Sequence, residues 1–133
     1  MPAEREQPGL DIAVRPHGDS VVAAISGEID LNTADALRKK LRELDAAGHR
    51  SIVVDFSGVT FCDATGIGVL VAAHNRGSEH GGAISLAGVR PAQRRLLVIT
   101  GLHNVFALHA SVEDALAHTA DSQADSPAPS PSS

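Results

Sequence analysis

The stretch SIVVDFSGVTFCDATGIG, residues 51–68, joins two apolar runs through a short polar link. Residues 51–58 are almost continuously apolar, which is the pattern of a strand buried on both faces of a parallel sheet. Residues 63–65, Asp-Ala-Thr, then open a helical run that stops near Gly77, although GVLV within this run is also compatible with a strand. The link therefore predicts a strand-to-helix junction at the carboxyl end of a strand, where α/β folds place functional loops.

Strand and helix signals alternate on both sides of this junction. The other strand candidates are residues 10–16, 20–30, 83–88 and, at a sheet edge, 104–108. The other helix candidates are a helix capped by Asn32 or Thr33 and ended by Gly48, one from Pro91 to Gly101, and one capped by Ser111. This order predicts a single α/β domain, with a mixed, mostly parallel sheet of about five strands flanked by about four helices.

The composition predicts one domain with two unstructured ends. A chain of 133 residues that is 43% apolar can bury one hydrophobic core. We expect this domain to span residues 10–118. Residues 1–9, with two prolines and several charges, predict a flexible lead-in, and residues 119–133 predict a disordered tail rich in Ser and Pro.

Charge and residue usage disfavour several classes of partner. The formal net charge is −5 and only two lysines occur, so a basic face for nucleic-acid backbones or acidic membranes is not expected. Trp and Tyr are absent, which leaves no platform for base stacking. A single cysteine cannot form an internal disulfide, and no apolar run approaches the roughly 18 residues that span a bilayer. We therefore expect a cytoplasmic protein that binds neither nucleic acid nor membrane.

The residues around the link do not match known catalytic or metal-binding patterns. A phosphatase loop would need an arginine where Gly68 stands, and no phosphate-binding Gly-Lys-Ser/Thr sequence occurs. Cys62 is interpreted as a small buried apolar residue, and the seven histidines form no compact ligand motif. We predict no catalytic residue, metal or cofactor. A helix start at Asp63, Ala64 and Thr65 suits either a plain cap or a site for an added phosphate.

The ordered motifs resemble the STAS domain of bacterial anti-sigma factor antagonists over about residues 10–118. The matching segments are residues 27–30 (GEID), 53–56 (VVDF), 59–61 (VTF), 63–68 (DATGIG), 81–82 (GG) and the helix from Pro91 to Leu102. The resemblance implies binding to an anti-sigma factor, usually a serine kinase, so that a sigma factor is released for transcription. It also implies phosphorylation of the residue after Asp63 by that kinase, with a phosphatase reversing it.

The resemblance implies a set of partner-binding residues in two turns and one helix start. They are Asp30, Asn32, Asp63, Ala64, Thr65, Gly66 and Ile67. We expect the protein to be a monomer when free. A phosphate at this surface would repel the partner through its charge and its cost of desolvation.

The sequence departs from the family at the phosphoacceptor position, which is Ala64. The protein is then a natural antagonist that cannot be phosphorylated there, or Thr65 replaces the missing hydroxyl, or the alanine was introduced by engineering. We favour a protein that is not switched at position 64. Moving the hydroxyl by one residue at a helix start turns it by about 100°, away from the position that the kinase would address.

An alternative function keeps the same domain. STAS-like domains also serve as adaptor subunits of transporters or stress-sensing complexes, in which they bind an ATPase or another STAS domain. A small enzyme is the weakest alternative, because no acid–base pair or phosphate-binding lysine accompanies the link.

Overall fold

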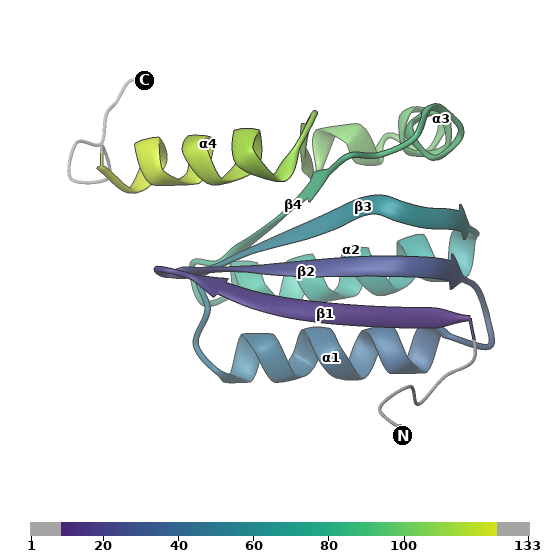
Figure 1. Ribbon diagram of the computed structural model, residues 1–133, viewed down its shortest axis with the longest axis horizontal. Coiled ribbons are helices and arrows are strands. Elements are labelled where there is room, and N and C mark those ends of the chain that lie inside the picture. Colours follow the sequence, from purple (N-terminus) through teal and green to yellow (C-terminus); the bar gives the residue numbers. More distant parts are fainter. Residues whose placement is uncertain (1–8, 125–133) are drawn as a thin grey trace.

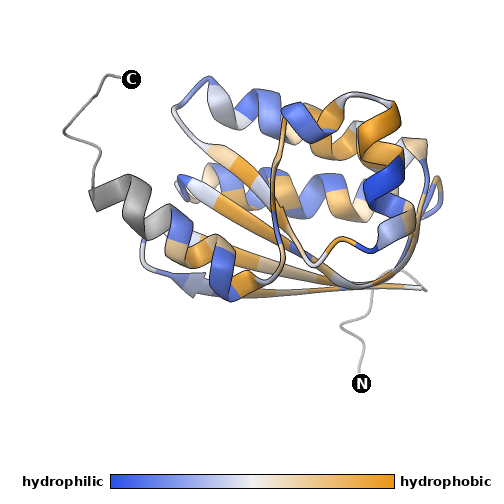
Figure 2. Cartoon of the chain, turned by 90° about the horizontal axis from the view of Figure 1, so that it is seen from above, coloured by the Kyte–Doolittle hydropathy of each residue, from blue (hydrophilic) through white to orange (hydrophobic). Residues whose placement is uncertain are grey.

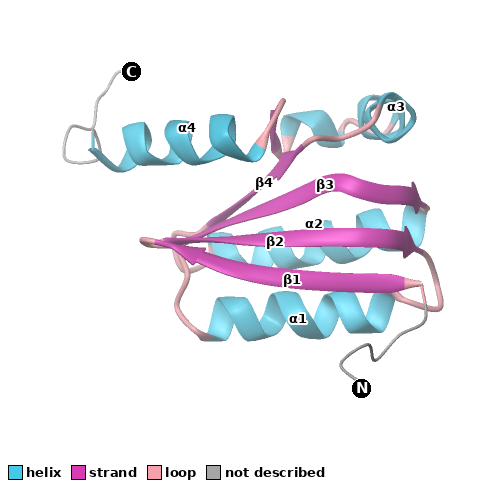
Figure 3. Ribbon diagram, viewed as in Figure 1, coloured by secondary structure: helices cyan, strands magenta, loops and turns pink. Residues whose placement is uncertain are grey.

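The computed structural model describes residues 9–124 and contains five strands and four α-helices in the predicted order. The strands are β1 (Leu10–His17), β2 (Ser20–Ile29), β3 (Ser51–Cys62), β4 (Ala83–Ala87) and β5 (Ala107–His109). The helices are α1 (Ala34–Ala46), α2 (Ala64–Ser78), α3 (Pro91–Ile99) and α4 (Val112–Ala124), with a short 3₁₀ helix, η1, at Leu102–Asn104. Figure 3 shows how strands and helices alternate along the chain.

The five strands form one sheet in the order β1-β2-β3-β4-β5. The pair β1 and β2 is antiparallel, whereas each of the other pairs is parallel, which confirms the predicted mixed, mostly parallel sheet. Figure 1 shows α1 and α2 on one side of the sheet and α4 on the opposite side. Within the described residues, no helix combines the length and the apolar character needed to span a bilayer.

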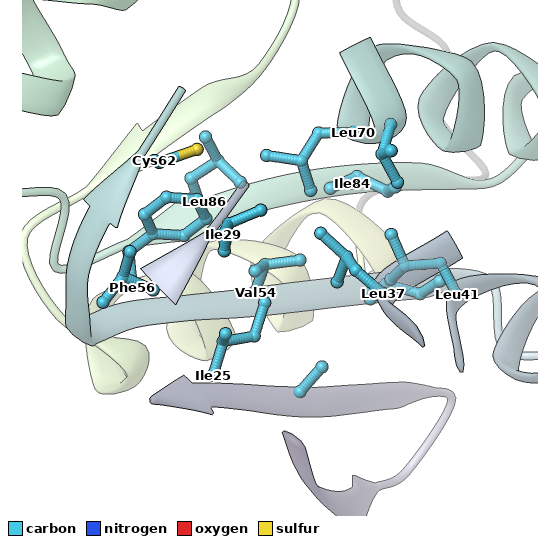
Figure 4. Close-up of a cluster of buried hydrophobic side chains, with 14 of the residues drawn as sticks. Ile25, Ile29, Leu37, Leu41, Val54, Phe56, Cys62, Leu70, Ile84 and Leu86 are labelled. Atoms are coloured by element: carbon cyan, nitrogen blue, oxygen red, sulfur yellow. The ribbon is translucent and has the colours of Figure 1, made fainter. Parts of the chain in front are cut away.

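The main core lies between the sheet and the helices α1, α2 and α3. Alternate residues of the strands, among them Ile25, Val54 and Leu86, point into it and meet Leu41 and Leu70 from α1 and α2 (Figure 4). A smaller cluster on the other face joins Val22, Val53 and Ala87 to Ala115 of α4. The central strands β2 and β3 are therefore buried on both faces, as the apolar run at residues 51–58 predicts.

The described part of the chain ends within α4, which is longer than predicted. Residues 1–8 of the expected lead-in and residues 125–133 of the expected tail lie outside the described residues. The backbone of α4, however, continues to Ala124, beyond residue 118 where the sequence analysis places the end of the domain. The hydroxyl of Ser111 accepts a hydrogen bond from the Asp114 N–H at 3.1 Å, which confirms the predicted cap of this helix.

Strand β3 is longer than predicted, because it passes Gly58 and continues to Cys62. Its pairing with β2 shifts register twice, so that β3 gains one extra residue between Asp55 and Gly58 and another between Val59 and Phe61. A side chain at Gly58 would collide with Ser26, since a Cβ there would lie 2.8 Å from the Ser26 Oγ. These bulges keep β3 paired with β2 up to the link, although the sequence pattern is irregular there.

The predicted edge strand at residues 104–108 is only partly correct. Gly101 has a left-handed φ of 78°, after which the chain forms η1 and pairs with β4 only over Ala107–His109. The carbonyl of Leu102 accepts from the N–H groups of Val105 and Phe106, which closes a helical turn instead of extending a strand. Phe106 is buried in the main core, so its apolar character reflects packing rather than strand pairing.

Candidate functional site

The two predicted partner-binding turns meet at the carboxyl ends of β2 and β3. The turn after β2 begins at Asp30, and the turn after β3 is the single residue Asp63 before α2. The N–H of Asp63 donates to the carbonyl of Ile29 at 3.1 Å, which links the start of α2 directly to the end of β2. The sequence-predicted site residues are thus brought together at one edge of the sheet.

Asp63 is the N-cap of α2. Its backbone is extended, with φ −100° and ψ −174°, and its carboxylate accepts from the Gly66 N–H at 3.1 Å. Its carbonyl also accepts the first helical hydrogen bond, from the Ile67 N–H. Of the two roles that the sequence allowed for this acid, the capping role is confirmed.

Ala64 and Thr65 are the first two residues of α2, and they differ in exposure. Ala64 is exposed, whereas Thr65 is half-buried. A side chain at position 64 therefore projects from a fixed helix start and contributes little to the core. An added group at this position would lie beside the free N–H groups and partial positive charge of the helix N-terminus.

Gly66 and Ile67 lie on the buried side of the start of α2. A Cβ at Gly66 would lie 2.4 Å from the Ile29 Cγ2 and 3.0 Å from the Cys62 Sγ, so only glycine allows α2 to pack this closely on β2. Ile67 is buried in the main core. The structure therefore gives both residues a packing role, and any contact of theirs with a partner stays a prediction.

Cys62 lies under the link and is buried, as interpreted from the sequence. Burial raises the pKa of its thiol to about 12, and the nearby Asp63 carboxylate adds to the shift. The thiol donates a long hydrogen bond to the Asp63 carbonyl at 3.6 Å. A thiol in this environment stays protonated and is a poor nucleophile.

The turn after β2 is organised by Asp30. One oxygen of its carboxylate accepts from the N–H groups of Asn32 and Thr33, at 2.9 and 3.2 Å. The Thr33 hydroxyl donates to the Glu28 carbonyl at 2.9 Å and accepts from the Asp30 N–H at 3.0 Å. Thr33 is the N-cap residue of α1, one of the two residues predicted for this position, but its hydroxyl makes no capping hydrogen bond and bonds back toward the end of β2 instead.

Two exposed apolar side chains lie beside these turns, Leu31 within the turn that the sequence predicts to bind a partner and Phe61 at a position that it did not predict. Leu31 is 76% exposed between Asp30 and Asn32, and Phe61 is 49% exposed near the end of β3. A large apolar residue inside a polar turn is a signal that was available for Leu31. Phe61 had no comparable signal, since its outward direction follows from the bulges of β3.

A second missed feature connects the start of α3 to β3. Beyond Asp55, β3 has no pairing with β4, and side chains at the start of α3 donate hydrogen bonds to carbonyls of β3 instead. Arg90 Nη2 donates to the Ser57 carbonyl at 3.1 Å, and Gln93 Nε2 donates to the Val59 carbonyl at 3.3 Å. Gln93 also accepts from the Arg90 N–H through its Oε1, at 3.2 Å. The bulged part of β3 is thereby held in place next to the site.

The arrangement places two turns and one helix start on one surface, joined by the bond from the Asp63 N–H to the Ile29 carbonyl. Within residues 9–124, no group of three or more His, Cys, Asp or Glu side chains is placed to hold a metal ion.

A family model described as "Mlab, STAS domain" matches residues 12–112 of the chain. The chain belongs to the STAS domain family.

Relatives of this STAS domain include proteins named as anti-sigma factor antagonists. The chain is 32% identical over 109 residues to the anti-sigma-F factor antagonist RsfB of Mycobacterium tuberculosis, which covers 80% of this chain and 87% of that protein. It is 30% identical over 104 residues to the anti-sigma-B factor antagonist of Bacillus subtilis, covering 78% and 94% of the two chains.

A solved structure supports the same relationship. The crystal structure of an anti-sigma factor antagonist from Mycobacterium paratuberculosis superposes on this STAS domain with a TM-score of 0.76 and 31% sequence identity. The match covers 82% of this chain and 92% of the other. The family resemblance stated from the sequence motifs is therefore confirmed.

Proposed function

We propose that this STAS domain is an anti-sigma factor antagonist, which binds an anti-sigma factor of the serine-kinase type and so frees a sigma factor for transcription. The observation that carries the proposal is the exposed position 64 on a helix start that is capped by Asp63 and bonded to the end of β2. The names of relatives that align over most of their length support this assignment.

The contact surface in this proposal combines the two turns with their exposed apolar neighbours. Asp30, Asn32 and Ala64 offer polar and backbone groups, while Leu31 and Phe61 offer apolar area that binding would remove from water. Aromatic and large aliphatic side chains of this kind carry much of the energy in protein interfaces. The protein acts by binding, as a cytoplasmic monomer without a cofactor, and it is not an enzyme.

The same proposal makes binding insensitive to phosphorylation at position 64. Ala64 has no hydroxyl, and Thr65 is half-buried and turned away by one helical step of about 100°. The antagonist is then always competent to bind. A phosphatase becomes a partner only if the kinase phosphorylates Thr65.

The proposal is tested with the anti-sigma kinases encoded in the same genome. Calorimetry with and without ATP would compare the parent chain, Ala64→Ser and, as a matched control, Ala46→Ser at the exposed end of α1. We expect all three to bind without ATP, and only Ala64→Ser to gain a phosphate by mass spectrometry and to lose affinity when ATP is added, because the phosphate repels the partner.

Three results would contradict this proposal. Absence of binding to every anti-sigma kinase would remove the antagonist assignment. A phosphate on Thr65 of the parent chain would remove the claim that the protein is not switched. Binding to a transporter ATPase or to another STAS domain, without binding to any anti-sigma factor, would favour an adaptor subunit instead.

A further inference from the structure

A groove of about 430 Å³ runs between α2 and α3 and begins at the candidate site. Its α2 wall consists of Ala64, Ile67, Gly68, Val71, Ala72 and Asn75. Leu96 of α3 and Thr100, the residue that caps the end of α3, form the opposite wall together with Leu102 of η1. The surface is almost entirely apolar, and Ala64 belongs both to the groove and to the site.

The α2 wall has the shape that a second helix requires. Ala64, Gly68 and Ala72 are four residues apart, so that they stack one turn above another along a single face. Small residues in such a row leave a channel along the helix axis into which a ridge of side chains from another helix can pack. From Ala64 to Asn75 the channel is about 16 Å long, or about three helical turns.

The channel at Gly68 is open. A Cβ built on Gly68 meets no atom within 4 Å, in contrast to Gly66 on the buried side of the same helix. The glycine at position 68 is therefore not required by packing within the chain. A larger side chain there would fill the groove without disturbing the core.

The charge around the groove differs from that of the whole chain. The chain carries a net charge of −5, yet α2 and α3 contain no Asp or Glu, and Arg95 directly precedes the groove residue Leu96, about 100° around α3, whereas Arg94 lies on the far side of that helix. Arg94 and Arg95 are exposed, and neither forms an ion pair with another side chain in the described part of the protein. This face can therefore attract acidic groups.

Exposed apolar area on α3 extends the same face. Ile99 is 74% exposed and lies four residues after Arg95, so that the two side chains share the side of α3 next to Leu96. Figure 2 shows the corresponding change along α3, from hydrophilic residues to hydrophobic ones. The combination of an apolar channel with an arginine beside it matches an amphipathic helix that has acids beside its apolar stripe.

We propose that the groove between α2 and α3 receives an acidic amphipathic helix of the anti-sigma factor. This inference rests on the proposed function and names the partner element that the site recognises. The partner helix places its apolar stripe along Ala64, Gly68 and Ala72 and its acidic flank beside Arg95. Because Ala64 lies at the end of the groove, a phosphate at position 64 would meet that acidic helix, which gives the family's switch a direct electrostatic cause.

The first test measures affinity of the intact chain for the anti-sigma kinase by calorimetry. Gly68→Leu fills the groove, and Ala46→Leu adds the same side chain at the exposed end of α1 as a control. Leucine favours helix more than glycine does, so the fold of the first variant is retained, and circular dichroism checks this. We expect Gly68→Leu to weaken binding at least tenfold and Ala46→Leu to change it less than twofold.

Charge reversal supplies an independent readout. Arg95→Glu places an acid beside the groove, and Arg42→Glu makes the same change on the exposed face of α1. We expect about tenfold weaker binding for Arg95→Glu at low salt, a smaller difference at high salt, and no such effect for Arg42→Glu. Equal affinity of the parent chain, Gly68→Leu and Arg95→Glu for the kinase would overturn the groove assignment while leaving the antagonist function intact.

A partner-independent test uses two synthetic helical peptides of about 14 residues with the same leucine stripe, one with glutamates and one with lysines on its flanks. In ¹⁵N-correlated NMR spectra of the parent chain, we expect the acidic peptide alone to shift the amide signals of Gly68, Ala72 and Leu96. Shifts at these positions with decanoate but with neither peptide would assign the groove to a fatty acid and overturn the proposal. No shift with the acidic peptide would overturn it as well, whether or not the kinase binds.

Discussion

At position 64, the fold places almost no demand on the side chain. Ala64 is exposed at the first residue of α2, while its neighbours Asp63 and Gly66 have defined roles in capping and close packing. The residue there can therefore be exchanged for another with little effect on stability. A methyl group at this point removes the phosphoacceptor and leaves the rest of the helix start unchanged.

A glutamate at position 64 separates stability from binding. We expect Ala64→Glu to unfold with a free energy within about 1 kcal/mol of the parent chain, because an acid in the first turn of a helix is tolerated or favourable. The same charge should weaken binding to the anti-sigma factor at least tenfold, since it imitates the phosphate. Thermal unfolding and calorimetry measure the two effects, with Ala64→Gln as the neutral control of similar size. A glutamate variant that binds like the glutamine variant would contradict the electrostatic explanation.

Cys62 allows a prediction about pH. The pKa of its thiol is about 12 in the folded protein and 9.0 in its ordinary state, so the folded thiol keeps its proton where the unfolded one loses it. The contribution to stability is therefore complete below about pH 9 and declines as the pH rises toward 12, by at most about 1.4 kcal/mol per pH unit. Denaturant unfolding between pH 8 and 11 measures the decline. Cys62→Ala should lack this part of the slope, and an identical slope in both proteins would assign it to other groups.

At the scale of elements, the end of β3 depends on the start of α3. Gln93 is buried and its amide connects the Val59 carbonyl to the Arg90 N–H, so that two backbone groups depend on one side chain. Gln93 thus joins the bulged part of β3 to the first turn of α3. This contact explains how an irregular strand can hold a functional helix start in a fixed position.

Replacing Gln93 should cost more than replacing its neighbour. We expect Gln93→Leu to lower the free energy of unfolding by about 1–3 kcal/mol, because it removes both hydrogen bonds of a buried amide, to the Val59 carbonyl and from the Arg90 N–H. Arg94→Leu, at an exposed position on the same helix, should change it by less than about 0.5 kcal/mol. Chemical denaturation monitored by circular dichroism compares the two variants. Equal effects would mean that the Gln93 bonds do not support β3.

At the scale of the whole molecule, the two faces of the sheet are covered very differently. Three helices and η1 contribute to the main core, whereas in the described residues the opposite face has one cluster, in which Ala115 of α4 meets Val22, Val53 and Ala87. The candidate site and the groove lie at elements of the more heavily covered face. The role of α4 is thus to keep the central strands buried on both sides.

Removing α4 tests this role. A chain that ends at Ser111 exposes Val22 and Val53, and burial of each valine contributes about 1.5–3 kcal/mol, so we expect a loss of roughly 3–6 kcal/mol in the free energy of unfolding. A chain that ends at Ala124 keeps α4 and should unfold like the parent. Thermal unfolding followed by circular dichroism distinguishes the two. Unchanged stability of the shorter chain would show that α4 is not needed to complete the fold.

The sequence by itself determined the order of the elements, the mixed sheet and the start of α2. These features depend on local signals, namely the apolar run at residues 51–58, the helical period after Thr65 and an acid at the N-cap position, Asp63. Local signals act within one or two turns of chain, so they can be interpreted without knowing which residues pair across the sheet. The family motifs depended on the same residues, and they predict that Ala64 occupies the phosphoacceptor position.

Only the tertiary structure decided how the site is built and how far it extends. The bulges of β3 arise from its pairing with β2. The hydroxyl of Thr33 donates to the Glu28 carbonyl because the turn after β2 brings these two groups together. In the same way, Leu96 belongs to the groove because the fold places α3 across the groove from α2, although the two helices are separate in the chain. Contacts of this kind are set by the packing of the whole domain, which no short stretch of sequence contains.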